Sequence, residues 1–328
     1  MISLKQILKK TIKYFLEFFV YTNLHIGILA TSLAWSNSVL LASPNQSLLL
    51  FIFFSTILIY NMDRLISFQS DFINSPSRSS FITRHVIFIK IIICLSVVII
   101  LLLTIYFNSF FRIIVFFLFM LTVSYLFLFN GEISNRRNLS GFPGRNSLKI
   151  QSARKESYFG SISWSDKKIS FMKPVLLAFV WASATIILPI IHSGKQISLA
   201  ATGLFLIRYI EYLVNGIFFD FKDLSGDSKN YKKNIFLDFK PDLVFQWTAL
   251  LLIIETGFIL GFVFFRILPF VIISDLLIVF FYLFLLLNIW NIKLFGRKTM
   301  TLKVSSLAFS LLADGILAVP AIFFFFYQ

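Results

Sequence analysis

Two groups of aspartate residues are the part of this chain most suited to chemistry. Of its 328 residues, 58% are hydrophobic and only 15 are Asp or Glu. The first group contains Asp63 and Asp71, and the second contains Asp220, Asp223 and Asp227. Carboxylates beside long apolar segments are costly to keep, so their presence indicates a functional site.

The spacing within the second group suits a divalent cation. Asp220, Asp223 and Asp227 lie at positions i, i+3 and i+7, which places them on one face of a helix. Mg²⁺ prefers oxygen ligands and often combines one or two carboxylates with a substrate phosphate. Two groups facing one cavity therefore predict a pair of Mg²⁺ ions that holds a diphosphate. The predicted catalytic residues, which are also the predicted metal ligands, are Asp63, Asp71, Asp220, Asp223 and Asp227.

The candidate substrate-binding residues are basic and polar side chains near these aspartates. They are Asn61, Arg64, Arg78, Arg136, Arg137, Lys222, Arg208, Tyr212 and Asn215. The basic residues nearest the clusters would contact phosphate oxygens, and Asn61 would support the first metal site. Arg208, Tyr212 and Asn215 share a helical face with Glu211, and two interpretations stay open. This face is either a polar wall of the substrate cavity or the place of a structural Arg208–Glu211 pair.

Composition places these residues in an all-helical integral membrane protein. The mean hydropathy is +0.86 and only 14% of residues are charged. A spanning helix needs about 20 mostly apolar residues. Nine windows of this kind predict nine transmembrane helices, at 18–41, 48–60, 86–107, 111–129, 174–191, 198–219, 243–264, 267–290 and 305–327. The whole chain, 1–328, is expected to form one polytopic domain.

The distribution of basic residues predicts the orientation of these spans. Lys and Arg gather at the N-terminus and in alternate loops, above all in a long basic loop at 131–172, whereas the opposite loops hold only Arg112, Lys195 and Arg266. This bias places the N-terminus in the cytoplasm and the C-terminus outside. Both aspartate groups then face the cytoplasm, and the spans form two four-helix halves plus a ninth helix. Membrane orientation, rather than nucleic-acid binding, explains the net charge of +15.

Several motifs together resemble the UbiA prenyltransferase superfamily. The pattern Asp220-x-x-Asp223-x-x-x-Asp227 after the sixth apolar window is similar to the second aspartate motif of that family. The residues after the second window resemble the first aspartate motif of the family. They are Asn61, Asp63, Asp71, Pro76 and Arg78. The stretch from Lys173-Pro174 through Trp181 to Pro189 looks like the fifth helix of some bacterial members. One departure is Ser67, where other members commonly carry Asp.

The resemblance implies a transferase of the bacterial inner membrane with its active site facing the cytoplasm. Such an enzyme uses Mg²⁺ to ionise an allylic prenyl diphosphate and passes the prenyl group to an aromatic or lipid acceptor, as in quinone biosynthesis. The implied partners are prenyl diphosphate, a hydrophobic or aromatic acceptor and the lipid bilayer. The prenyl chain would lie in an apolar tunnel, with aromatic faces stabilising the allylic cation.

Three alternatives stay open at this point. A protein of the same fold could transfer a sugar phosphate to a polyprenyl phosphate. A non-catalytic relative is favoured by Ser67. A secondary transporter would use buried charges as an ion path, and its candidate residues are Arg208, Glu211, Glu255 and Asp314. A transporter site is expected near the bilayer midplane, whereas the aspartate groups lie at one edge.

Overall fold

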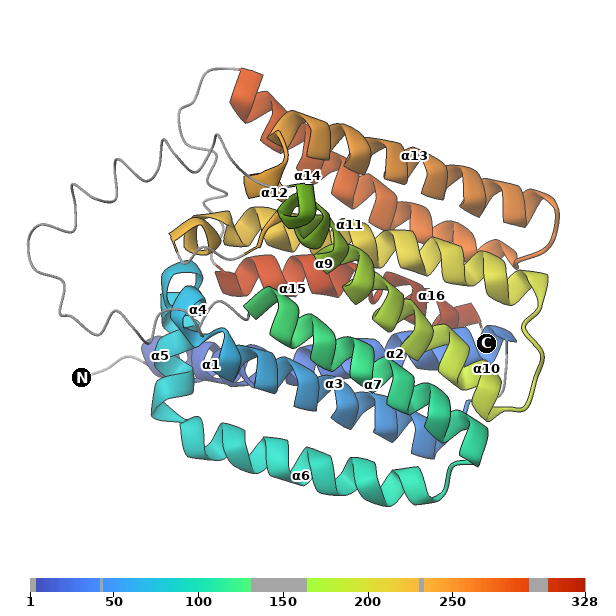
Figure 1. Ribbon diagram of the computed structural model, residues 1–328, viewed down its shortest axis with the longest axis horizontal. Coiled ribbons are helices and arrows are strands. Elements are labelled where there is room, and N and C mark those ends of the chain that lie inside the picture. Colours follow the sequence, from blue (N-terminus) through green and yellow to red (C-terminus); the bar gives the residue numbers. More distant parts are fainter. Residues whose placement is uncertain (1–3, 42–43, 131–163, 230–232, 295–305, 328) are drawn as a thin grey trace, which may run out of the picture.

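The protein is a bundle of long helices with short helices at one end. The computed structural model describes residues 4–41, 44–130, 164–229, 233–294 and 306–327, and no β-strand occurs within these ranges. Apart from the first helix, the long helices lie side by side with their axes in roughly the same direction (Figure 1). The prediction of an all-helical fold is confirmed for the described part of the chain.

The helices of the N-terminal part are listed here with their bounds. They are α1 (Leu4–Tyr21), α2 (Leu24–Leu41), α3 (Gln46–Ile66), α4 (Phe68–Asn74), α5 (Pro76–Arg84), α6 (Val86–Ile105) and α7 (Ser109–Asn130). The short helices α4 and α5 follow the aspartate-bearing end of α3, where Pro76 begins α5 in a position that suits proline. The first aspartate group therefore lies where a long helix gives way to short ones.

The C-terminal part repeats this pattern of long helices followed by a short one. Its elements are α9 (Trp164–Ala182), η2 (Ser183–Ile187), α10 (Leu188–His192), α11 (Leu199–Lys229), α12 (Ile235–Asp238), α13 (Pro241–Phe264), η3 (Phe270–Asp275), α14 (Leu276–Leu294), α15 (Ser306–Ile316) and α16 (Val319–Tyr327). The second aspartate group occupies the last turns of α11. In Figure 1 this end of α11 lies beside α4, at the same end of the bundle as the first group.

Seven of the described helical segments are long and apolar enough to cross a membrane, and an eighth is formed if the bent pair α15 and α16 counts as one span. The longest helix, α11, is not among them because Arg208, Glu211 and Asn215 lower its apolar character. The nine-span count, the orientation and the two halves therefore stay predictions. Membrane insertion agrees with the large apolar side chains exposed on α6 and α7, such as Ile105 and Phe116.

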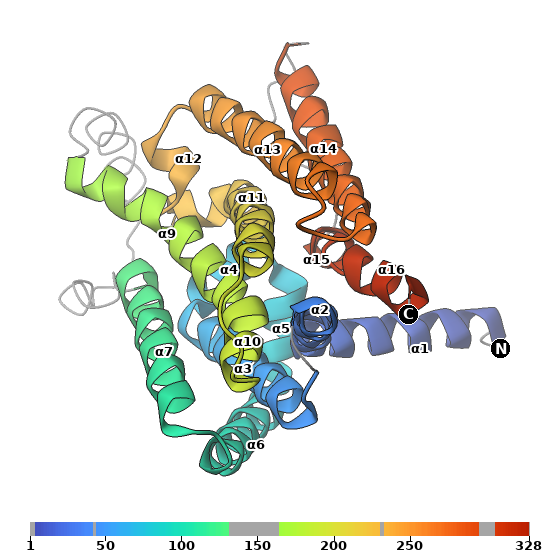
Figure 2. The same ribbon diagram turned by 90° about the vertical axis from the view of Figure 1, so that its right-hand side faces the viewer.

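The prediction for the start of the first span is wrong. The window 18–41 is divided between α1 and α2, because the chain turns at Asn23, whose φ of 61° lies in the left-handed region that asparagine tolerates. The long helix of this window begins at Leu24. Figure 2 shows α2 end-on and α1 running crosswise to it, away from the bundle. The apolar residues before Asn23 thus belong to a separate helix.

The largest buried core lies between α9, α11, α13 and α14. Side chains such as Leu204, Val214, Val244 and Ile278 have no exposed surface there. This packing fixes the α11 helix, which carries the second aspartate group, against the C-terminal helices. A rigid support of this kind holds functional side chains at the end of a helix in one geometry.

Candidate active site

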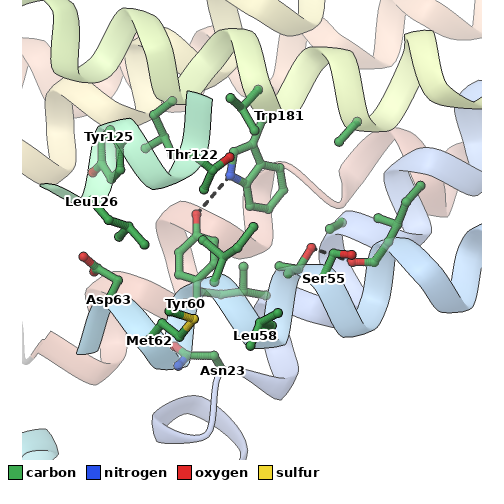
Figure 3. A pocket seen from close by; sticks show the side chains of 18 of the residues that line it. Asn23, Ser55, Leu58, Tyr60, Met62, Asp63, Thr122, Tyr125, Leu126 and Trp181 are labelled. Atoms are coloured by element: carbon green, nitrogen blue, oxygen red, sulfur yellow. Dashed lines mark hydrogen bonds between the residues drawn. The ribbon is translucent and has the colours of Figure 1, made fainter. Parts of the chain in front are cut away.

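All five predicted aspartates line one cavity of about 990 Å³ in the described part of the chain. The residues lining it come from α2, α3, α6, α7, α9 and α11, among other elements. Its wall is mostly apolar, and the aspartates gather at the end where α3 and α11 finish. Figure 3 shows one part of this cavity, with Asp63 near Tyr125 and Leu126. The two aspartate groups, which were predicted to face one cavity, therefore do line the same cavity.

The first group is held on successive helical turns. The backbone N–H of Ser67 donates to the carbonyl of Asp63 (2.7 Å), and that of Asp71 donates to the carbonyl of Ser67 (3.1 Å). The Ser67 hydroxyl also donates to Oδ1 of Asp63 at 3.2 Å. Asp71 is paired with Arg64 at 3.3 Å and with Arg78 at 3.2 Å. Asp63, position 67 and Asp71 thus form one continuous edge of the cavity.

The second group is paired with a lysine from a different helix. Nζ of Lys173, on α9, lies 2.5 Å from Oδ1 of Asp220. Asn234 donates from Nδ2 to Oδ2 of Asp227 (2.9 Å) and to the backbone carbonyl of Asp220 (2.7 Å). Asn234 therefore joins two of the three aspartates and fixes their relative positions.

Burial changes the ionisation of groups at this end of α11. It raises the pKa of Asp227 to about 6, an effect that the nearby Lys173 ammonium opposes. Burial likewise lowers the pKa of Lys222, whose Nζ lies 3.4 Å from Oδ1 of Asp223. The carboxylates are therefore poorly solvated and depend on cations for stabilisation.

A close contact between α4 and α11 joins the two aspartate groups. Oδ1 of Asn74 accepts hydrogen bonds from the backbone N–H of Gly226 (2.7 Å) and from the Ser225 hydroxyl (3.3 Å). A Cβ atom at position 226 would lie 2.3 Å from the same oxygen, so glycine is required for this approach. The separation of the two groups is thus set by a direct contact between their helices.

The oxygen atoms at the site fit Mg²⁺, a metal that commonly retains substrate and water ligands. No group of three or more His, Cys, Asp or Glu side chains within the described ranges is arranged to hold a metal ion unaided. Mg²⁺ binds through one or two carboxylates plus phosphate oxygens and does not need such a group. Oδ2 of Asp220 is buried and forms no hydrogen bond to the described residues, and Oδ1 of Asp223 is buried with the Lys222 ammonium 3.4 Å away; both oxygens can act as ligands.

The other predicted binding residues are only partly brought to the cavity. Arg64, Arg78, Tyr212 and Asn215 line it. Lys222 is not among the lining residues, and its ammonium lies over the ring of Phe219 at 5.0 Å. The predicted Arg136 and Arg137 lie outside the described residues.

Asn61 and Arg208 are placed behind the cavity wall rather than on it. Asn61 accepts a hydrogen bond from Asn23 and donates to the backbone carbonyl of Thr22, both at 3.1 Å, so it holds the turn between α1 and α2. Arg208 is fully buried and pairs with Glu211 at 2.7 Å and Asp275 at 3.1 Å. Of the two interpretations of this face, the structural pair is favoured for Arg208, while Tyr212 and Asn215 form cavity wall.

Sequence reasoning missed Lys173, Tyr60 and Tyr125 as site residues. Trp181 donates from its indole N–H to the hydroxyl of Tyr60 at 3.0 Å, and Figure 3 shows this pair beside the cavity. A signal existed for Lys173, since it is a basic residue directly before an apolar window. Tyr60 directly precedes Asn61 of the first motif, which was a signal, whereas Tyr125 had none because Phe, Tyr and Trp are abundant throughout the chain.

Comparison of the chain with family models, with curated proteins and with solved structures gives no match.

Proposed function

We propose that the protein is a membrane-embedded transferase that moves a prenyl group from an allylic prenyl diphosphate to an aromatic or lipid acceptor with the help of Mg²⁺. The observation that carries this proposal is the shared cavity. Five aspartates and several cations gather at one end of a space whose remaining wall is largely apolar. A molecule with a diphosphate at one end and a hydrocarbon chain at the other matches this division of charge.

The basic residues would bind the diphosphate directly. Nε of Arg64 and Nε of Arg78 are buried without a hydrogen-bond acceptor in the described part of the chain, so they have donors to offer a phosphate oxygen. Lys173 would bring a third positive charge from α9. These cations pair with the aspartates, and phosphate oxygens would share them when substrate binds.

The aspartates would supply the oxygen ligands of the cation. Asp220 and Asp223 each have a buried oxygen without a hydrogen bond to the described residues, and Asp63 and Asp71 face them from the α3 and α4 side. Mg²⁺ bound there would neutralise charge that develops on the departing diphosphate. The first and second aspartate groups are held close by Asn74, which favours binding of both to one diphosphate.

The apolar wall would accommodate the prenyl chain and the cation formed from it. Leu101 and Phe116 line the cavity, and each has 62% of its surface exposed. A prenyl chain could therefore enter from the lipid side between α6 and α7. The rings of Tyr60, Trp181 and Tyr212 border the cavity, and aromatic faces stabilise a nearby carbocation.

The positions of the intramembrane charges do not favour the transporter alternative. Three of its four candidate residues, Arg208, Glu211 and Glu255, are fully buried and are not among the residues that line the cavity, whereas the fourth, Asp314, lines it. Arg208 is instead enclosed by carboxylates, as expected of a group that fixes helix packing.

The function is tested by replacing one aspartate charge at a time. Asp220→Asn and Asp227→Asn should each reduce Mg²⁺-dependent diphosphate release from farnesyl diphosphate by about 100-fold or more, because the loss of a carboxylate ligand weakens binding of the cation that would stabilise the departing diphosphate. Asp242→Asn is the matched control, since Asp242 is exposed at the start of α13. The measurement is released diphosphate from purified protein in lipid nanodiscs. Full activity in both site variants would rule out the proposed mechanism.

A further inference from the structure

A histidine–aspartate pair lines the cavity and has no part in the diphosphate site. Nε2 of His25 lies 3.4 Å from Oδ2 of Asp314, and their side chains are only 8% and 11% exposed. His25 belongs to the first turn of α2, and Asp314 belongs to α15. Both residues line the same cavity as the five aspartates. Segments almost the full length of the chain apart thus meet at the place where substrates would bind.

Hydrogen bonds fix His25 relative to the first aspartate group. Asn23 lies two residues before His25 and donates from Nδ2 to Oδ1 of Asn61 at 3.1 Å. Asn61 donates back to the carbonyl of Thr22 at 3.1 Å and lies two residues before Asp63 on α3. His25 is therefore held beside the aspartate-bearing end of α3, and Figure 3 shows Asn23 and Asp63 on the same side of the cavity.

The helix carrying Asp314 is fixed in a similar way. The Tyr282 hydroxyl lies 3.3 Å from the carbonyl of Ala313 and 2.9 Å from Oδ1 of Asn215, to both of which it can donate. Both ring nitrogens of His25 and Oδ2 of Asp314 are buried, and none forms a hydrogen bond to the described residues. A buried polar group without a hydrogen-bond partner is costly. A polar group of a substrate could form the hydrogen bonds that these atoms lack.

We propose that His25 is the base that takes the proton lost by the acceptor, and that Asp314 is a positioning residue whose carboxylate, with Oδ2 3.4 Å from Nε2, orients the imidazole through its charge. This inference rests on the proposed prenyl transfer. The bond between the allylic carbon and the diphosphate oxygen breaks, and its electron pair leaves with the diphosphate. A new bond forms between the allylic carbon and the acceptor. The acceptor proton passes to Nδ1 of His25 and then to water, which balances the reaction.

The base narrows the class of acceptor. A proton is transferred efficiently when the acidity of donor and base are not far apart. Phenolic hydroxyls ionise near a pH of about 10, whereas alkyl alcohols are far weaker acids, so a base in the cavity removes a phenolic proton much more readily. The rings of Tyr60, Trp181 and Tyr212 form part of the wall and would stack on an aromatic acceptor. The geometry therefore selects an aromatic acceptor with a free hydroxyl.

The first test uses 4-methylphenol and its methyl ether as probe acceptors, with farnesyl diphosphate as donor. The quantity measured is the ratio of prenylated aromatic product to farnesol formed by water capture. In the wild type, the phenol should react and the ether should not. His25→Gln should lower the ratio for the phenol by about 100-fold, a typical contribution of a general base. His85→Gln, at an exposed position between α5 and α6, is the matched control.

A second test separates proton transfer from a structural role. In His25→Gly, added imidazole should restore phenol transfer, and the same imidazole should not affect Asp220→Asn. Asp314→Asn should lower transfer about 10-fold in the wild type and have no further effect in His25→Gly, because residues acting as a unit are not additive.

The possible failures are distinguishable. A wild-type protein that releases no diphosphate overturns the proposed function and this inference with it. Normal diphosphate release together with an unchanged product ratio in His25→Gln overturns this inference alone. Reaction of the methyl ether as fast as the phenol, or absence of rescue by imidazole, also overturns it.

Discussion

At the scale of the residue, the site is built from carboxylates that are already paired with cations. Asp71 is held by Arg64 and Arg78, and Asp220 is held by Lys173. Pairing reduces the cost of burying a charge, which explains how these aspartates can be buried in a bundle of apolar helices. Under the proposed function, the same pairing would prepare the site for an anion, because each cation could turn from its carboxylate to a phosphate when Mg²⁺ takes that carboxylate.

Ser67 is the position at which this site has one carboxylate fewer than the family motif that the sequence resembles. Because its hydroxyl donates to Asp63 and its side chain lines the cavity, Ser67→Asp should place a third acid beside Asp63. We expect the Mg²⁺ concentration for half-maximal diphosphate release to fall about 3- to 10-fold, since added ligand charge raises cation affinity. Ser67→Asn, which adds no charge, is the control. An unchanged Mg²⁺ response in Ser67→Asp would mean that this side chain does not face the metal.

At the scale of the element, one helix–helix contact and one turn decide where the functional residues lie. The contact of Asn74 with Gly226 brings α4 onto α11, and the left-handed turn at Asn23 separates α1 from α2. Neither feature follows from apolar periodicity. The glycine in the second aspartate motif could have suggested a close approach, but nothing in the sequence indicates that Asn74 is its partner.

Gly226→Ala tests this helix–helix contact. The added methyl group would displace the Asn74 side chain and break its bonds to Gly226 and Ser225. We expect a loss of about 1–3 kcal/mol in the free energy of unfolding, from the broken bonds and steric strain, with a clear drop in diphosphate release. Gly257→Ala is the control, because a Cβ atom there meets no atom within 4 Å. Equal thermal stability and activity of the two variants would show that the contact does not hold the clusters together.

The turn at Asn23 directs α1 away from the bundle, and this predicts that α1 lies along the membrane surface. Leu8, Ile12 and Phe15 are 60%, 51% and 65% exposed on one face, whereas Lys10 and Lys13 lie on another. Such a helix buries its apolar face among lipid headgroups. Nitroxide labels at Ile12 and at Lys13, in a Cys94→Ser background, should differ in collision rates. Oxygen should reach the first label more readily, and a water-soluble nickel chelate should reach the second. Equal exposure of both labels to the chelate would place α1 in water.

At the scale of the whole molecule, the sequence predicted the kind of fold better than its contacts. Apolar windows and sparse charges were enough to predict an all-helical bundle and to select the aspartates that share the cavity. The pairs Lys173–Asp220 and His25–Asp314 join segments that are far apart in the chain. Helix packing brings them together, and the sequence of one chain holds no direct record of that packing. The same limit applies to Arg208, whose partner Asp275 lies on another element.

The orientation of the bundle is the remaining large-scale prediction. All but five of the 30 basic residues lie in segments expected to face the cytoplasm, the exceptions being Lys90, Arg112, Lys195, Arg208 and Arg266. Single cysteines at Ser140, in the long basic loop, and at Ser193, directly after α10, should therefore react from opposite sides of the membrane in a Cys94→Ser background. The measurement is labelling of intact cells and of inverted vesicles by a maleimide that cannot cross the membrane. We expect Ser193→Cys to react in cells and Ser140→Cys to react only in inverted vesicles. If both react from the same side, an odd number of spans does not separate them, and the aspartate groups need not face the cytoplasm.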